Sequence, residues 1–197
     1  MSKDRLPGLQ QVKSWMRQLA SVHRIPGQVK DTWRHSTVIW RFADSIARSA
    51  ILNGYSVDRK FLKVACYIHD LGRMVTGGLA SRQLRPAIYH LYEGYYFLIN
   101  RGYPQLARVC LSHVCGVGST AALNKRYGFI AKNYFPKSIE EKIVAYADAR
   151  TDPKKGVGPY IWPFSYPVKR FKKYPGVVIR LKRQQSFIIK ITAGSIS

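Results

Sequence analysis

The chain has 197 residues, 46% of them hydrophobic and 13% aromatic, so it is long enough to bury a substantial core. Its 33 Lys and Arg residues and 10 Asp and Glu residues give a formal net charge of +23. This charge indicates either a protein that binds polyanions or a solvated basic surface without a dedicated partner. Composition argues against a membrane-spanning or disulfide-rich protein. No run reaches the roughly 18 apolar residues of a span, the start lacks a signal-peptide core, and three cysteines fit no disulfide or zinc pattern. We therefore expect a soluble cytoplasmic protein with free thiols.

The first third of the chain shows two helical patterns. Apolar residues at helical spacing predict a short amphipathic helix over residues 7–22 and a longer helix over residues 29–52, separated by Pro26 and Gly27. Counting back one turn from the apolar stripe of the longer helix places His35 on its core side. His35 is therefore the first of several polar residues expected to face the core.

Each of the next three expected helices carries one histidine on its core side or at its end. His69 lies near the end of the first, His90 lies within the second, and His113 ends the third. Gly72 terminates the first of these helices, and a basic, glycine-containing loop follows it. The ranges expected for the three helices are 57–72, 86–100 and 104–113.

A capping box predicts the start of the next long helix. A short helical piece is expected near residues 120–126, followed by Ser138 and Glu141, whose side chains would each satisfy the other residue's backbone N–H. The helix that follows carries apolar residues at helical spacing and then Asp148, within the run VAYADA. Asp148 is thus a second acidic residue, besides Asp70, with apolar neighbours.

The composition changes after Asp152 to one rich in Pro, Gly, aromatic and basic residues. Residues 177–191 are predicted as a basic amphipathic helix, although their β-branched residues also suit a strand. Interleaved aromatic and basic residues suit nucleic-acid binding, but an arm that packs its aromatics back on the bundle is the simpler expectation. We expect an all-α fold of about six or seven helices in residues 1–152, with residues 153–197 as a basic, aromatic-rich extension packed on or beside it.

Histidines and aspartates at core-facing positions together predict a metal site. A single such histidine is usually a hydrogen-bonded structural residue, but this chain places four histidines and two aspartates on five separate helices. A buried carboxylate without partners costs several kcal/mol, and neighbouring imidazoles with a divalent metal remove that cost. Imidazole and carboxylate ligands together suit Fe, Mn, Co, Ni or Zn. The candidate ligands are His35, His69, Asp70, His90, His113 and Asp148.

The order of these residues resembles the HD superfamily of metal-dependent phosphohydrolases, whose mark is H…HD…D. The resemblance is strongest to the small stand-alone archaeal-type HD hydrolases and extends over about residues 30–152. It rests on the stretches HDLGR (69–73), HLYEGYYFL (90–98), LARVCLSHVCGVG (106–118) and NYFPKSIEEKIVAYAD (133–148). The resemblance implies an all-α HD-domain bundle with the metal site in its middle.

The resemblance also implies roles for individual residues. A first metal would be held by His35, His69, Asp70 and Asp148, and Asp70 would bridge to a second metal held by His90 and His113. The number of ions stays open, because two-metal relatives often have a second histidine where this chain has Val114.

Asp70 and Arg73 would be the catalytic residues. Gly72 would allow a sharp turn that lets Arg73 face a phosphate. Arg82 and Arg85 are further substrate-binding candidates, although ordinary surface arginines are the simpler expectation for both.

The resemblance implies hydrolysis of a phosphate ester by metal-activated water. The expected substrate is a phosphorylated small molecule, in particular a nucleotide or related compound, and the basic surface is a candidate for nucleic-acid contact. Two alternatives stay open: a di-iron oxygenase, because a branch of the same superfamily carries out oxidative chemistry, and a non-catalytic nucleic-acid-binding protein. The sequence does not distinguish which metal binds or the oligomeric state.

Overall fold

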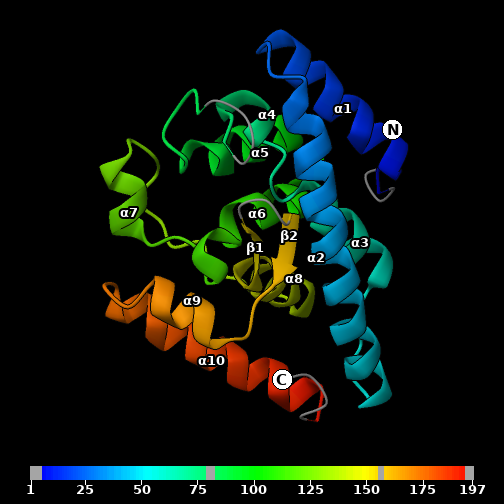
Figure 1. Cartoon of the computed structure of the whole chain (residues 1–197), viewed down its shortest axis with the longest axis vertical. Helices are drawn as coiled ribbons and strands as arrows, with labels where there is room; N and C mark the ends of the chain where they lie inside the picture. Colours follow the sequence, from blue (N-terminus) through cyan, green and yellow to red (C-terminus); the bar gives the residue numbers. More distant parts are fainter. Residues whose placement is uncertain (1–5, 79–82, 155–157, 194–197) are drawn as a thin grey trace.

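The computed structural model describes residues 6–78, 83–154 and 158–193. Its elements, shown in Figure 1, are in chain order α1 (Leu9–Val22), α2 (Gly27–Leu52), α3 (Arg59–Ile68), α4 (Arg73–Thr76), α5 (Tyr89–Ile99), α6 (Pro104–Ser112), a 3₁₀ turn (Val114–Gly116), α7 (Ala121–Arg126), α8 (Ile139–Arg150), β1 (Thr151–Lys154), β2 (Gly158–Ile161), α9 (Ser165–Arg170) and α10 (Pro175–Ile191). The all-α fold class is confirmed. The short helix α4, of four residues, brings the helices described within residues 1–152 to eight, one more than the six or seven expected.

The long helix α2 runs through the bundle and contacts α1, α3 and α8 (Figure 1). Its buried face consists largely of small or branched apolar side chains, which allow neighbouring helices to approach closely. These residues are Ile39, Ala43, Ile46, Ala47 and Ala50. Because His35 lies one turn before Ile39 on the same face, it is directed inward with them.

The predicted start of α8 is confirmed, but its capping differs in one bond. The Ser138 hydroxyl accepts a hydrogen bond from the Glu141 N–H at 3.1 Å, as a capping box requires. The Glu141 carboxylate instead accepts from the N–H of Lys137, at 2.6 Å, and its other oxygen pairs with Arg108 at 2.8 Å. The reciprocal bond to Ser138 is therefore replaced, because Glu141 is buried beside a cation on α6.

Two helix boundaries differ from the sequence prediction. The helix expected over 57–72 ends at Ile68 and continues, after a turn, as α4. The helix expected to begin at Pro86 begins at Tyr89, and the three residues before it form a turn in which Tyr89 N–H donates to the Pro86 carbonyl at 3.0 Å.

The C-terminal segment packs on the bundle. Helix α10, and not the alternative strand, contains residues 177–191, and it contacts α8 and α2. Before it, β1 and β2 form an antiparallel pair that the sequence did not predict, with Pro153 opposite Pro159. Proline at a position that donates no ladder hydrogen bond is tolerated at an edge, but it hides the strand pattern.

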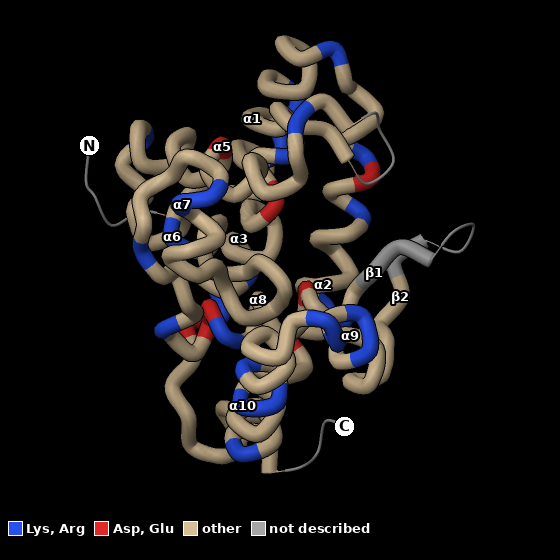
Figure 2. Tube along the Cα trace, turned by 90° about the vertical axis from the view of Figure 1, so that its left-hand side faces the viewer, with Lys and Arg blue, Asp and Glu red and all other residues tan. Residues whose placement is uncertain are grey.

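Within the described residues, no helix is long and apolar enough to cross a membrane. Lys and Arg residues are distributed over many elements, with several on α9 and α10 (Figure 2), whereas Asp and Glu residues are few. The positive charge is therefore a property of the whole molecule and does not by itself mark one site.

Candidate metal centre

The structure brings the six candidate ligands together in the middle of the bundle. They come from α2, the end of α3 and the turn after it, α5, the end of α6, and α8. Each of the four histidines is 5% exposed or less, and Asp70 is 1% exposed. The residues are His35, His69, Asp70, His90, His113 and Asp148.

Asp70 lies between two pairs of histidines. Its Oδ1 is 3.1 Å from His90 Nε2 and 3.5 Å from His113 Nε2. Its Oδ2 is 3.6 Å from His69 Nε2 and 3.8 Å from His35 Nε2. The two carboxylate oxygens thus face different pairs of imidazoles, which is the arrangement that a carboxylate shared between two ions would need.

Asp148 completes the half of the cluster that contains His35 and His69. Its Oδ1 is 3.2 Å from His35 Nε2 and 3.5 Å from His69 Nε2. Two groups have ligand atoms that all lie within 4.8 Å of one another: His35, His69 and Asp148, and His69, Asp70 and His113. His69 belongs to both groups, so it lies at the centre of the constellation.

Backbone carbonyls orient three of the four imidazoles. In each of the three, Nδ1 faces a carbonyl oxygen about one turn earlier. The pairs are His69 with Cys66 at 2.8 Å, His113 with Val109 at 3.3 Å, and His90 with Ala87. Because a carbonyl can only accept, Nδ1 carries the proton and the Nε2 lone pair faces the cluster.

The resulting lone pairs face one another. His90 Nε2 and His113 Nε2 are 3.1 Å apart, an arrangement that is favourable only with a cation or a proton between them. Within the described part of the chain, His69 Nε2 and Asp70 Oδ1 are buried and have no hydrogen-bond partner. Buried polar atoms without partners are rare in native proteins, so these atoms indicate a missing ligand. The donor set of neutral imidazole and carboxylate fits a divalent transition metal.

The pKa values favour ligand-competent protonation states for three of the six groups. Burial opposes ionisation of Asp70, but the charges of Arg73 and His69 hold its pKa well below the usual range. Burial likewise opposes ionisation of Asp148, but the neighbouring imidazoles of His35 and His69 lower its pKa. Burial and the Arg73 charge lower the pKa of His90 to about 4. Both carboxylates are therefore ionised at neutral pH and His90 is neutral.

His69 behaves differently from His90. Burial alone would lower its pKa, but the charges of Asp70 and Asp148 and the Cys66 carbonyl raise it overall. A proton on His69 would occupy the space between two carboxylates in which a cation would bind. Protons and metal therefore compete for this residue.

Gly72 is required for close packing and not for a special backbone angle. The chain does turn between α3 and α4, but the φ of −65° and ψ of −13° at Gly72 are helical, so this turn does not need the conformational freedom of glycine. A Cβ at this position would lie 2.0 Å from the carbonyl oxygen of His90 and 2.8 Å from the amide nitrogen of Gly94. The missing side chain allows the segment after Asp70 to lie against α5, and this contact brings Asp70 to His90.

A cavity of about 470 Å³ opens onto the cluster. Arg73 lines it, and its Nε donates to Asp70 Oδ2 at 2.6 Å. Arg85 does not line it: this exposed arginine pairs with Glu93 at 2.8 Å on the surface of α5. Arg82 lies outside the described residues. Of the three arginines considered, the structure therefore brings Arg73 to the cluster.

The C-terminal extension supplies two cavity residues that the sequence analysis did not identify. Arg170 ends α9, Phe171 follows it, and both line the cavity. The only sequence signal was the basic and aromatic composition of the segment, which does not tell which of its residues faces the site.

Cys115 also lines the cavity, with a positive φ of 54°. Burial raises the pKa of its thiol to about 11, despite the opposing charge of Arg170. The thiol is protonated at neutral pH and is not a nucleophile of the site.

Comparison with known proteins identifies the family. A model of the HD domain matches residues 32–151, which is more than half of the chain. The chain belongs to the HD domain family. This membership accounts for the order of the six residues along the chain.

Two curated relatives and one solved structure are similar to this HD protein. It is 31% identical to an uncharacterized protein of Methanocaldococcus jannaschii over 115 residues, which are 58% of this chain and 62% of that protein. It is 32% identical to a tRNA (cytidine(56)-2′-O)-methyltransferase of Picrophilus torridus over 92 residues, which are 46% of this chain and 24% of that protein. The chain therefore spans less than two thirds of either relative. The crystal structure of the HD domain of the L. monocytogenes phosphodiesterase PgpH aligns with a TM-score of 0.48 and 15% identity, over 93% of this chain and 97% of that one.

Proposed function

We propose that this HD protein is a metal-dependent phosphohydrolase that cleaves a phosphate ester of a nucleotide or a related compound. The observation that carries the proposal is the convergence of four imidazoles and two carboxylates, of which His35, His90, His113 and Asp148 line a cavity together with Arg73. A divalent metal bound there would lower the pKa of a coordinated water and polarise the phosphoryl group. The proposed ligands are the six residues of the cluster.

We assign the following roles to residues of the cluster and the cavity. Asp70 faces both histidine pairs and would fix their positions relative to each other. Arg73 is fixed by its bond to Asp70 and would neutralise charge on the phosphate. Arg170 would contact phosphate from the opposite side of the cavity, and the ring of Phe171 offers an apolar surface for a base.

The shape of the cavity supports a small-molecule substrate. A volume of about 470 Å³ falls within the range of ordinary ligand sites, which are mostly apolar with a few placed polar groups. The relative that is a tRNA methyltransferase acts, by its name, on tRNA, and this adds RNA ends to the classes of phosphate ester worth testing. We propose residues 1–152 as the catalytic unit, with residues 153–197 completing the cavity.

A panel assay tests the proposal. Purified protein, loaded separately with Mn, Co, Ni, Fe or Zn, would be offered nucleoside monophosphates, cyclic mononucleotides and dinucleotides, dinucleoside polyphosphates and 2′,3′-cyclic RNA ends. Metal-dependent release of phosphate or of a linear product, lost in Asp70→Asn, is the expected result. Consumption of oxygen by the iron-loaded protein, without hydrolysis of any ester, would support an oxygenase and contradict the proposal.

A further inference from the structure

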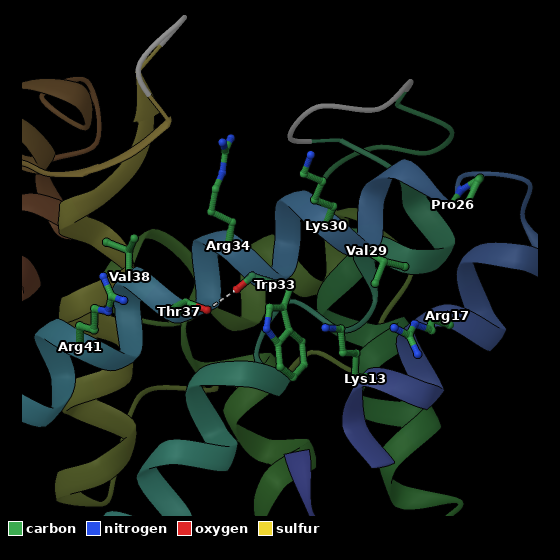
Figure 3. Close-up of a pocket in the computed structure, with 10 residues that line it drawn as sticks. All are labelled: Lys13, Arg17, Pro26, Val29, Lys30, Trp33, Arg34, Thr37, Val38 and Arg41. Carbon is green, nitrogen blue, oxygen red and sulfur yellow. Dashed lines mark hydrogen bonds between the residues drawn. The ribbon is translucent and has the colours of Figure 1, made fainter. Parts of the chain in front are cut away.

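A second and larger cavity lies between α1 and α2 (Figure 3). Its volume is about 770 Å³, and it shares no lining residue with the metal cavity. None of its described lining residues is acidic. Five of them are cationic: Lys13, Arg17, Lys30, Arg34 and Arg41.

This basic groove, defined by those five residues and Trp33, faces away from the metal cluster. With about 100° of rotation per residue, a side chain two positions from His35 lies about 160° around the helix from it. Trp33 and Thr37 are both two positions from His35. Helix α2 therefore presents the metal cluster on one side and the basic groove on the other.

Trp33 forms the floor of the basic groove. Its half-buried ring lies 4.5 Å from the ring of Tyr67, measured between centroids. The Thr37 hydroxyl donates to the Trp33 carbonyl at 2.8 Å, and both residues appear at the centre of Figure 3. Lys13 Nζ lies 4.8 Å from the centre of the Trp33 ring, so one ammonium is held at the floor. The indole is thus held in place, with the Tyr67 ring packed against it and the Lys13 ammonium over its ring.

The cations extend along the groove. Lys30, Arg34 and Arg41 follow one another on α2, and at 1.5 Å per residue Lys30 and Arg41 are about 16 Å apart along the axis. Figure 3 shows Lys30 and Arg34 extending away from the helix, and Lys13 and Arg17 on the facing helix α1. Among the residues that the structure describes, the one ion pair of these five cations joins Arg34 to Asp31 at 3.8 Å; it is solvent-accessible, so it is weak. Such a row of cations is too long for one phosphate and suits a chain of phosphates.

We propose that the basic groove binds single-stranded nucleic acid, with successive phosphates on the five cations and a base or sugar against Trp33. A fixed aromatic surface inside a positively charged groove is the combination that binds unpaired bases and their backbone. A duplex keeps its bases stacked inside and would leave Trp33 unused. The net charge of +23 would draw any polyanion to the protein, and the groove would then select the single strand. This inference does not depend on the proposed activity.

A pair of charge-matched variants tests the site. The groove variant Lys30→Glu, Arg34→Glu, Arg41→Glu and the control variant Lys172→Glu, Lys182→Glu, Lys190→Glu change the same number of exposed cations. Binding of a fluorescent 12-nucleotide single-stranded RNA and its DNA equivalent would be measured by anisotropy at several salt concentrations. Circular dichroism would show that each variant is folded.

We expect the groove variant to bind the single strands at least tenfold more weakly than the control variant. The slope of log K against log salt should fall by about 2, because each lost phosphate contact on a single strand contributes about 0.7. Equal weakening in both variants would show that only the overall charge matters and would overturn the proposal. Tighter binding of the matching duplex, or groove-dependent binding of phosphatidylserine vesicles without binding of either oligonucleotide, would also overturn it.

Trp33→Phe tests the position of the base. It retains an aromatic ring against Tyr67 and all five cations. We expect the single strand to quench tryptophan fluorescence in the unmodified protein and to lose most of that quenching in Trp33→Phe. Unchanged quenching would show that the ligand does not contact Trp33 and would overturn its placement.

Discussion

Asp70 shows how one residue can organise a site. Its neighbours are four imidazoles within 3.8 Å and the guanidinium of Arg73 at 2.6 Å, all directed at two oxygens. In the absence of a cation, the lone pairs of His90 and His113 face one another, which is unfavourable. We therefore propose that the Asp70 carboxylate and the imidazoles hold a metal ion, and that Arg73 contacts the phosphate bound to that ion.

Replacing Arg73 by Ala should reduce catalysis while leaving metal bound. The loss of one charge-assisted contact to a phosphate corresponds to about 1.5–3 kcal/mol, or about a 10- to 100-fold fall in kcat/KM. Metal content should stay at the level of the unmodified protein, because none of the six ligand atoms is removed. Steady-state kinetics and elemental analysis on the same preparation check both expectations.

Arg85→Ala is the matched control for this experiment. Arg85 forms an exposed ion pair with Glu93 and does not line the cavity, so kcat/KM should change by less than about twofold. An equal loss in both variants would contradict the role assigned to Arg73.

Which residues form the cluster could be predicted from the sequence, but the environment of nearby polar residues could not. Helical spacing and the order of the histidines and aspartates predicted that all six face the core. This was possible because the 3.6-residue period of a helix determines on which face each side chain lies. For Asp44, one turn off the apolar stripe of α2, the same spacing predicts a solvated residue. The structure buries Asp44 between Arg48 at 2.8 Å and Arg59 at 2.7 Å. Arg59 comes from another helix, and periodicity within one helix contains no information about such a partner.

At the scale of elements, the contact between the turn after α3 and helix α5 decides whether the site can assemble. Gly72→Ala should destabilise the protein by about 3 kcal/mol or more, because a backbone carbonyl 2.0 Å from the added carbon cannot move aside without shifting α5. The same shift would separate Asp70 from His90 and lower metal content. Urea unfolding and elemental analysis check the two effects.

Gly27→Ala provides the comparison. Gly27 begins α2, and no atom lies within 4 Å of a Cβ built there. The free energy of unfolding of Gly27→Ala should exceed that of the unmodified protein by less than about 1 kcal/mol. A Gly72→Ala protein as stable as Gly27→Ala, with full metal content, would contradict the packing argument.

Helix α9 connects the C-terminal extension to the cavity. Arg170→Ala should raise KM about tenfold with little change in kcat, if Arg170 contacts the substrate in the ground and transition states alike. Lys169→Ala, its exposed neighbour that does not line the cavity, should leave KM within about twofold. Equal values of KM for Arg170→Ala and the unmodified protein would contradict the proposal that α9 contributes to the substrate site.

At the scale of the whole molecule, the metal should act as part of the core. The cluster joins side chains from within or at the ends of five helices, α2, α3, α5, α6 and α8, so a bound ion would connect them and stabilise the folded state. Removing metal with a chelator should lower the free energy of unfolding by about 2.7 kcal/mol relative to protein in a 100-fold excess of metal over its Kd. Thermal melts with and without metal measure this, and Asp70→Asn should show no such difference.

The general plan of the molecule was predictable, and its C-terminal part was not. Helices with clear apolar periodicity, such as α1 and α2, were predicted nearly to their ends. The β1–β2 pair contains proline at a paired position, and the placement of Phe171 over the site depends on how α9 packs against α8. Long-range packing of this kind has no periodic signature in the sequence.

The most direct test is the metal content of the purified protein and of two aspartate variants, measured by elemental analysis after loading and dialysis. The unmodified protein should retain one or two transition-metal ions per chain, and Asp70→Asn should retain less than about a tenth of that. Asp44→Asn, which also alters a buried aspartate on the core side, should lose about 1–2 kcal/mol of stability but keep the full metal content. No metal in the loaded unmodified protein, or equal metal in Asp70→Asn, would contradict the account and make the histidines structural.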